Sequence, residues 1–201
     1  PRGQADITLQ GKWSEDVITI DQLSGDLRQF ALVTNDLNIH ERRVVVSATG
    51  QFSQKSRHLF VRRATMASSA LSLATENFRW HGNSTGLDGR VGFRAKIGRL
   101  QSWFPTHTKT MPRLSGNGSG ELQWKLNGKQ TNFSGLTNFD NLEVRDANRA
   151  RTEVAKLLWH ERQLRIKLQG SMSAQHLQLS QLDLDADRLQ LRSQGSWEKA
   201  S

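Results

Sequence analysis

The sequence predicts an all-β fold, built as an elongated and mostly antiparallel amphipathic sheet. Apolar and polar residues alternate with a period of two along most of the chain, which places the apolar ones on one face of each strand. The alternating segments follow one another after short interruptions, as in a meander. Hydrophobic residues make up only 35% of the chain, below the figure of about 45–50% for a compact domain. The alternative fold is a β-sandwich, in which the same apolar positions would form a closed core.

The strands are predicted in order from the alternation itself. Near the end of the chain, short segments succeed each other closely enough for tight turns to join them. The clearest segments are Ile7-x-Leu9-x-Gly11-x-Trp13, Val44-x-Val46-x-Ala48-x-Gly50-x-Phe52, Leu122-x-Trp124-x-Leu126, Leu164-x-Ile166-x-Leu168-x-Gly170-x-Met172, Leu177-x-Leu179, Leu182-x-Leu184 and Leu189-x-Leu191.

An apolar-x-apolar-x-Gly-x-apolar unit recurs in these strands, around Gly11, Gly50 and Gly170 and more loosely around Gly195. The spacing between its copies is irregular, so it does not describe a solenoid of fixed period. Glycine inside a strand marks a bulge, a strong twist or a close approach of two backbones, or is simply a weak strand position.

One segment departs from the alternation. Ile97, Leu100, Trp103 and Phe104 have helical spacing, and Pro105 ends it, which predicts one short helix over residues 97–104. The polar stretch 105–113 is then a linker between a first β segment, 1–104, and a second, 114–201. In the second segment, glycines from Gly116 to Gly120 take the phase that Leu122 and Trp124 hold later, which predicts a continuous strand.

Residues 148–159 allow two interpretations. Ala150, Val154, Leu157 and Leu158 would share one face of a helix, whereas Ala155, Leu157 and Trp159 would continue a strand. We slightly favour the strand.

The formal charge of +9 suggests an anionic partner, but the basic residues are spread along polar strand positions rather than gathered in a run. A solvated strand face therefore explains most of them; anionic headgroups are the alternative, and we do not expect nucleic acid as a partner. The chain has no cysteine, which removes disulfides and thiol chemistry and is compatible with an oxidising compartment. It begins with Pro-Arg-Gly and has no apolar run of the roughly 18 residues that span a bilayer, so we interpret it as a segment of a larger protein.

The residues that carry chemistry in enzymes do not form a recognisable site here. The six histidines are isolated in sequence, and Asp183, Asp185 and Asp187 share one strand face without a calcium-binding loop. No nucleophile motif, phosphate-binding loop or dinucleotide fingerprint is present. We therefore expect no enzymatic activity, cofactor or metal.

Two stretches resemble a known family. The repeat texture of residues 177–191 and of residues 164–172 is similar to that of AsmA-like proteins and of their relative TamB. The segment 91–128, a strand followed by a short helix ending in Trp-Phe-Pro and then a glycine-alternating strand, also resembles a recurrent unit of these proteins.

The resemblance implies a twisted, U-shaped sheet whose apolar inner surface is a trough for phospholipid acyl chains. It also implies a location in the periplasm, an anchor in the inner membrane supplied by a segment outside this chain, and a non-enzymatic role in lipid transport or outer-membrane assembly. The rest of the same chain would extend the sheet. The candidate lipid-facing residues are Ile7, Leu9, Ile18, Ile20, Val44, Val46, Leu71, Leu73, Trp124, Ile166, Leu168, Leu179 and Leu191.

Two other functions stay open at this point. A structural or adhesive β-sandwich would pack the same apolar residues against a second sheet and bind protein partners. A binder of anionic polymers would use the positive charge together with exposed aromatic side chains, although the tryptophans mostly share the apolar phase.

Overall fold

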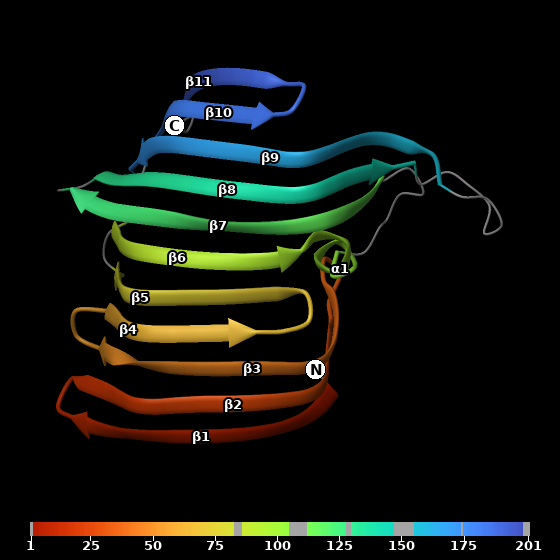
Figure 1. Ribbon diagram of the computed structural model, residues 1–201. Helices are drawn as coiled ribbons and strands as arrows, with labels where there is room; N and C mark the ends of the chain where they lie inside the picture. Colours follow the sequence, from red (N-terminus) through yellow and green to blue (C-terminus); the bar gives the residue numbers. More distant parts are fainter. Residues whose placement is uncertain are drawn as a thin grey trace.

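A computed structural model describes residues 2–82, 86–104, 112–127, 130–146, 155–173 and 175–198. They form one open antiparallel sheet of eleven strands, which lie side by side in the order of the sequence (Figure 1). The elements are β1 (Arg2–Ser14), β2 (Val17–Val33), β3 (Asn38–Ser53), β4 (His58–Ala67), β5 (Leu71–His81), β6 (Gly86–Lys96), α1 (Ile97–Gln101), β7 (Arg113–Asn127), β8 (Gln130–Arg145), β9 (Leu157–Met172), β10 (His176–Ala186) and β11 (Gln190–Glu198). The all-β prediction is confirmed. The sandwich alternative is wrong, because all described strands belong to a single sheet.

The two predicted β segments are parts of this one sheet. β6 pairs with β7 along most of its length, with Phe93 opposite Gly120, so the boundary does not separate two independent sheets. β7 is a continuous strand through Gly116, Gly118 and Gly120, as predicted. Of the predicted linker, residues 105–111 lie outside the described residues, and Arg113 already belongs to β7.

The predicted helix is present but shorter than expected. α1 covers Ile97–Gln101, and the chain then continues in tighter turns, in which the backbone N–H groups of Trp103 and Phe104 donate to the carbonyls three residues earlier. No helix in the described part of the chain is long and apolar enough to cross a bilayer. In the ambiguous region, residues 147–154 lie outside the described residues, and the strand interpretation is confirmed from Leu157 onward.

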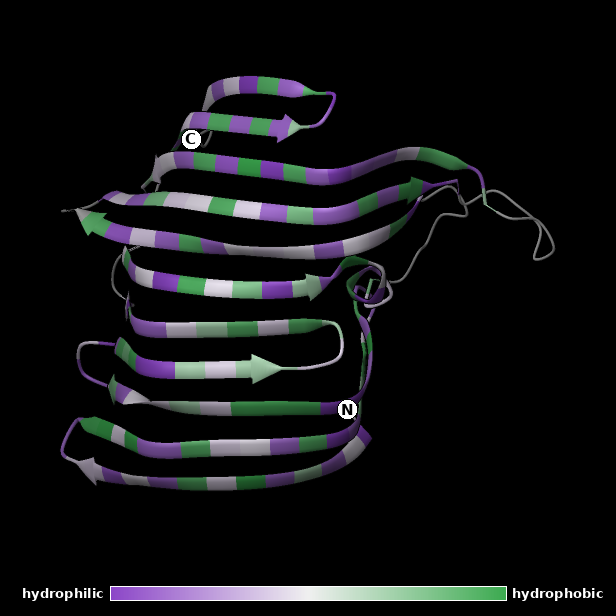
Figure 2. Cartoon of the chain, viewed as in Figure 1, coloured by the Kyte–Doolittle hydropathy of each residue, from purple (hydrophilic) through white to green (hydrophobic). Residues whose placement is uncertain are grey.

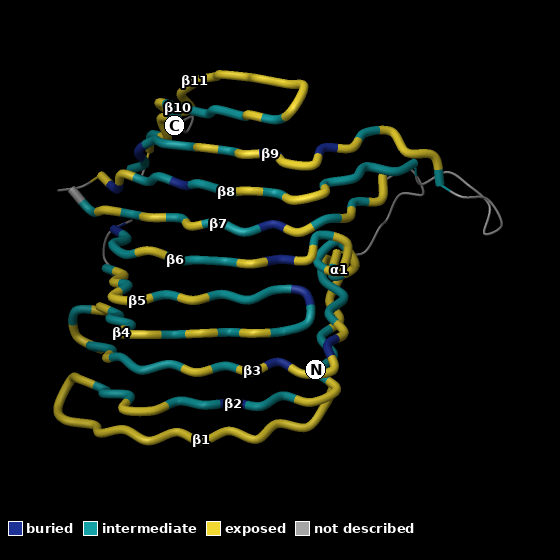
Figure 3. Tube along the Cα trace, in the orientation of Figure 1, coloured by how far each residue is buried: buried dark blue, intermediate teal, exposed yellow. Residues whose placement is uncertain are grey.

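The single layer leaves most side chains only partly covered. Its solvent-accessible surface is 14463 Å², about half as much again as the roughly 9,500 Å² expected of a compact protein of this mass. Among the described residues, the buried hydrophobic side chains are Val44, Ala70, Ala95 and Leu164. Figure 3 shows half-buried and exposed positions interspersed along the inner strands, whereas β1 and β11 are exposed throughout. The fold therefore depends on its backbone ladders and on contacts between neighbouring side chains within one face.

The repeated glycines mark irregularities in the ladder, as predicted. The β1–β2 register shifts between Gln10 and Gly11. Beside Gly50 and beside Gly170, the neighbouring strand carries one extra residue. A Cβ at any of these three glycines would collide with a carbonyl oxygen of the adjacent strand. Only glycine allows the two backbones to approach so closely at these bulges.

A second kind of irregularity bends the sheet near α1. Gly3 has a φ of 137° and lies against the backbone of Gln29, whose φ is 51°; Gly116, at 124°, lies in the same way against Asn141, at 51°. These φ values belong to the region that L side chains rarely adopt. Figure 1 shows the ends of β2 and β3 turning away from the line of the strands and toward α1.

Candidate functional site: an open apolar face

The strand register assigns each residue to a face of the sheet. Residues paired directly across antiparallel strands project to the same side, so a chain of such pairs traces one row of side chains. One row crosses all eleven strands and contains Ile7, Gly25, Val46, Met66, Leu73, Phe93, Gly120, Thr137, Ile166, Leu184 and Leu191. A single threonine is its only polar member.

The row two residues further along the strands is of the same kind. It contains Leu9, Leu23, Ala48, Ala64, Thr75, Val91, Leu122, Gly135, Leu168, Leu182 and Ser193. Flanking positions continue this surface, which we call the apolar face. By register or by strand phase, all thirteen residues predicted to face lipid lie on it, including Ile18, Ile20, Trp124 and Leu179 toward one end and Val44 and Leu71 toward the other.

The apolar face is open rather than packed. Ile7 and Leu9 in β1 are 64% and 65% exposed, and Leu191 in β11 is 47% exposed, although all three are large hydrophobic side chains. Most residues between these edges are half-buried by their neighbours on the same face. Val44 differs from them, because it is buried, with an exposed fraction of 8%.

Aromatic side chains lie along the end of the apolar face farthest from α1. Trp13, Trp80 and Trp197 are paired there with Ile18, Leu59 and Leu177, and the three tryptophan residues are 72%, 40% and 60% exposed. One step inward, Phe78 and Trp124 make an edge-to-face contact with ring centroids 6.4 Å apart. Gly89 lies close to Phe78 and pairs with Trp124, so its lack of a side chain lets the two rings meet.

At the opposite end, α1 packs on the apolar face. The side chains of Ile97 and Phe139 occupy the space above Gly118, where a Cβ would come within 3.3 Å of Ile97. Gly118 therefore makes room for Ile97 of α1 rather than leaving a gap. The helix closes part of this end and leaves the Trp13 end uncovered.

Glu41 fastens the turn that follows α1. This glutamate is 4% exposed; its Oε1 accepts a hydrogen bond from Trp103 Nε1 at 3.2 Å, and its Oε2 accepts one from the Ser69 backbone N–H at 3.0 Å. The Asn38 backbone N–H also donates to the Trp103 carbonyl at 2.6 Å. The sequence does not reveal this arrangement, because a lone glutamate in a strand resembles a solvated residue.

The other face of the sheet is polar. The row between the two apolar rows contains Thr8, Ser24, Ser47, Thr65, Ala74, Gly92, Glu121, Leu136, Lys167, Asp183 and Arg192. Figure 2 shows the resulting alternation of hydrophilic and hydrophobic residues along the strands. Asp183 and Asp185 lie on this face as predicted, whereas Asp187 follows the end of β10.

Basic residues on the polar face stand beside carboxylates. Arg63 lies 3.7 Å from Glu76, Arg90 lies 4.0 Å from Glu121, and Arg192 lies 3.9 Å from Asp183. In the described part of the chain, each of these pairs joins two neighbouring strands across the polar face.

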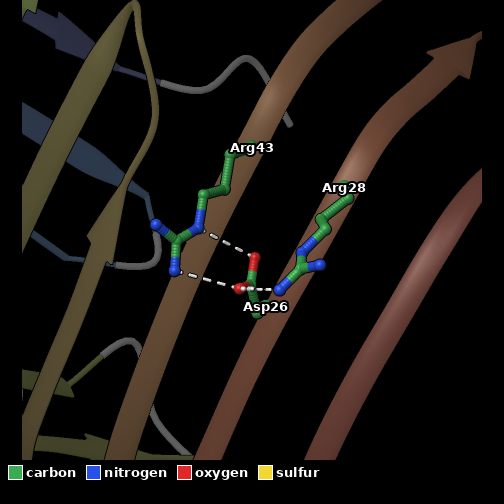
Figure 4. A network of polar contacts seen from close by, with 3 residues as sticks. All are labelled: Asp26, Arg28 and Arg43. Carbon is green, nitrogen blue, oxygen red and sulfur yellow. Dashed lines mark hydrogen bonds and ion pairs between the residues drawn. The ribbon is translucent and has the colours of Figure 1, made fainter.

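The most connected group of charges joins β2 and β3. Asp26 accepts hydrogen bonds from Arg43 Nε and Nη2, both at 3.0 Å, and its Oδ2 lies 3.4 Å from Arg28 Nη2 (Figure 4). The hydrogen bonds from Arg43 hold the pKa of the Asp26 carboxyl below its ordinary value of 3.8, against the smaller opposing effect of desolvation. The same pairing raises the pKa of Arg43.

This geometry predicts how Asp26 titrates. We expect carboxyl NMR to give a pKa below 3.8 for Asp26 and to find it shifted upward in Arg43→Gln. Arg28→Gln is the matched control and should shift it less, because Arg28 contributes less to the lowering. A lowered carboxylate pKa stabilises the fold at pH values above 3.8, and this stabilisation is lost as the pH falls through the pKa of the folded state. Equal shifts in the two variants would contradict the assignment.

Two histidines that are distant in sequence meet in space. His58 and His81 are directly paired between β4 and β5, and their ring centroids lie 4.6 Å apart in an edge-to-face arrangement. They are isolated in the sequence, and only the strand register brings them together. No third potential ligand joins them to form a metal-binding group within the described residues.

Comparisons of this chain with protein-family models, with curated proteins and with solved structures returned no match.

Proposed function

We propose that this chain is a lipid-handling sheet, in which the apolar face holds acyl chains out of water while they move along it. The observation that carries the proposal is the uncovered apolar face itself, with fully paired rows across eleven strands and with Leu9 and Leu191 on the two edges exposed to 65% and 47%. Soluble monomeric proteins rarely expose contiguous apolar patches larger than a few hundred Å².

The dimensions of the face suit acyl chains. With strands about 4.8 Å apart, eleven strands span roughly 48 Å, and the eight steps from Ala5 to Trp13 span roughly 27 Å at about 3.4 Å each. The hydrocarbon of one bilayer leaflet is about 15 Å thick, half of a 30 Å core. The face is therefore large enough for several acyl chains lying side by side.

The energetics favour such an arrangement. Each methylene that leaves water contributes about 0.8 kcal/mol, so a sixteen-carbon chain resists entering water by on the order of 10 kcal/mol. Contact with an apolar wall recovers part of this free energy without any covalent step. A transfer function of this kind therefore requires no catalytic residue or cofactor.

The resemblance to AsmA-like and TamB-like proteins supports the same proposal and supplies its context. In that context, the chain acts in the cell envelope, in the periplasm, as a non-enzymatic part of a protein that is anchored in the inner membrane and supports outer-membrane biogenesis. Phospholipids are the proposed cargo. The polar face would remain in water, where its threonines, serines and paired charges are well solvated.

Site-specific cross-linking tests the proposal. When the protein is mixed with phospholipid vesicles and irradiated, a photoreactive residue in place of Leu168, on the apolar face, should form covalent lipid adducts. Mass spectrometry detects these adducts. The same residue at Lys167, one position away on the polar face, is the matched control. We expect about tenfold more lipid adduct at 168 than at 167, because one residue step turns the side chain to the opposite face. Equal yields, or no adduct at 168, would refute the proposal.

A further inference from the structure

The last five strands, β7 to β11, repeat the residue and burial patterns of the first five, β1 to β5. β3 and β9 share the string His-Glu-Arg, at residues 40–42 and 160–162, and Gly50 corresponds to Gly170 at the same spacing. Their buried positions also agree, since Glu41 and Val44 correspond to Glu161 and Leu164. Agreement in both residues and burial indicates two copies of one structural unit.

The backbone irregularities repeat as well. Gly3 beside Gln29 in β1 and β2 corresponds to Gly116 beside Asn141 in β7 and β8, with φ values of 137° and 51° in the first pair and 124° and 51° in the second. In both copies the register shifts at these glycines. Strained conformations at matching places are stronger support for a repeat than similar apolar residues alone.

The remaining two strands of each unit also correspond. β4 begins His58-Leu59 and β10 begins His176-Leu177, and both have one extra residue opposite the bulge glycine of the preceding strand. Leu59 pairs with Trp80 of β5 in the first unit, and Leu177 pairs with Trp197 of β11 in the second.

β6 is the strand that joins the two units. It pairs with β5 on one side and with β7 on the other. β11 is the counterpart of β5, and β1 is the counterpart of β7. Each free edge of the sheet is therefore the counterpart of an edge that β6 covers inside the sheet.

Apolar residues on the two free edges are more exposed than their counterparts beside β6, as expected if β6 covers those counterparts. Leu122, beside β6, is half-buried, whereas its counterpart Leu9 in β1 is 65% exposed. Leu73, on the other side of β6, is half-buried, whereas its counterpart Leu191 in β11 is 47% exposed. The exposed apolar residues of the two edge strands are thus those that a strand of the β6 type would cover.

Both edge strands are long and uncovered in the described part of the chain. β1 has thirteen residues and β11 has nine, and neither contains proline or is covered by another element in the described part of the chain. Long edges with unpaired N–H and C=O groups readily accept an added strand.

We propose that both edges, β1 and β11, are docking sites for an added antiparallel strand of the β6 type, an extended polypeptide segment with apolar residues at the positions of Val91, Phe93 and Ala95. The register follows from the repeat. Val91 pairs with Leu122 and with Thr75 inside the sheet, so the corresponding partner residue lies beside Leu9 at one edge and beside Ser193 at the other. If two copies of the chain were placed end to end, β11 of one copy and β1 of the next would correspond to β5 and β7. Inside the sheet these two strands run parallel to each other, with the antiparallel β6 between them. One strand of the β6 type would therefore be needed between the two copies.

Disulfide trapping tests the register. The chain contains no cysteine, so Leu9→Cys, Ser193→Cys and the control Thr8→Cys each provide one thiol. A synthetic peptide of residues 86–96 with Val91→Cys is offered to each full-length variant. We expect cross-linking at positions 9 and 193 to exceed that at position 8 by about tenfold, because residue 8 faces the opposite side.

Three results would overturn the proposal: equal cross-linking at all three positions, no binding of the peptide, or disulfide dimers of Leu9→Cys alone, which would identify a second copy as the occupant.

A second variant guards against a poorly soluble peptide. The sequence 86–96 appended to the C-terminus through a flexible linker should protect β11 amides from hydrogen exchange, and unchanged exchange would also refute the proposal. Neither experiment depends on lipid binding.

Discussion

Replacing Gly89 by alanine is expected to destabilise the sheet by about 3 kcal/mol, the largest effect we predict for a single methyl group. Gly89 has a φ of 138°, and a Cβ there would lie 2.7 Å from the Phe78 Cα and 3.0 Å from its ring. The backbone strain costs about 1–3 kcal/mol, and the steric overlap costs a similar amount, because the Phe78 backbone cannot move without breaking its ladder. The free energy of unfolding from chemical denaturation measures the effect.

Gly92 provides a matched control in the same strand. A Cβ at Gly92 meets nothing closer than 3.9 Å, so Gly92→Ala should change the free energy of unfolding by no more than about 0.5 kcal/mol. Gly89→Ala should also alter the fluorescence of Trp124, whose indole contacts Phe78 across this glycine. Equal stability of the two variants would show that the close approach at Gly89 is not required.

The face that each strand residue occupies could be predicted from the sequence, because side-chain alternation is a local property of an extended chain. All thirteen candidate residues lie on one face for this reason. The glycine bulges were also predictable, since Gly11, Gly50 and Gly170 interrupt an otherwise apolar phase. Whether that face is open could not be predicted, because alternation is the same in an open sheet and in a sandwich.

Features that depend on the strand register, or on a break in the alternation, could not be predicted from the sequence. In β3 the buried residues Glu41 and Val44 are three positions apart, separated by the exposed Arg42 and Arg43, so the period of two fails there. The meeting of His58 with His81 depends on the β4–β5 register. The close approach of Gly3 to the backbone of Gln29 involves a positive φ at a glutamine, which no residue pattern indicates.

Correspondence between the two units could have been found in the sequence. The His-Glu-Arg strings at 40–42 and 160–162 are its clearest trace. The trace is weak elsewhere, because an alternating strand constrains only every second residue and accepts many apolar types at each. The register and the matched φ values make the correspondence plain, and they also assign β6 a place between the units.

Loss of the Glu41 carboxylate is expected to release the turn after α1 from the sheet. Glu41→Ala leaves the Trp103 indole N–H and the Ser69 N–H without their acceptor, and hydrogen bonds to a charged group contribute about 1.5–3 kcal/mol each. We expect a loss of about 2–3 kcal/mol in the free energy of unfolding and faster hydrogen exchange at the amides of residues 97–104. The exposed neighbour Arg42→Ala is the control and should leave both unchanged.

Trp103→Phe separates the hydrogen bond from the packing of the ring. It keeps an aromatic side chain beside β3 but removes the donor to Glu41 Oε1, while the Asn38 N–H still donates to the carbonyl of residue 103. The exchange rates of residues 97–104 should therefore lie between those of the unmodified chain and of Glu41→Ala. If Trp103→Phe and Glu41→Ala both exchange as slowly as the unmodified chain, Glu41 does not hold this segment, and packing of Ile97 over Gly118 must hold α1 on the apolar face instead.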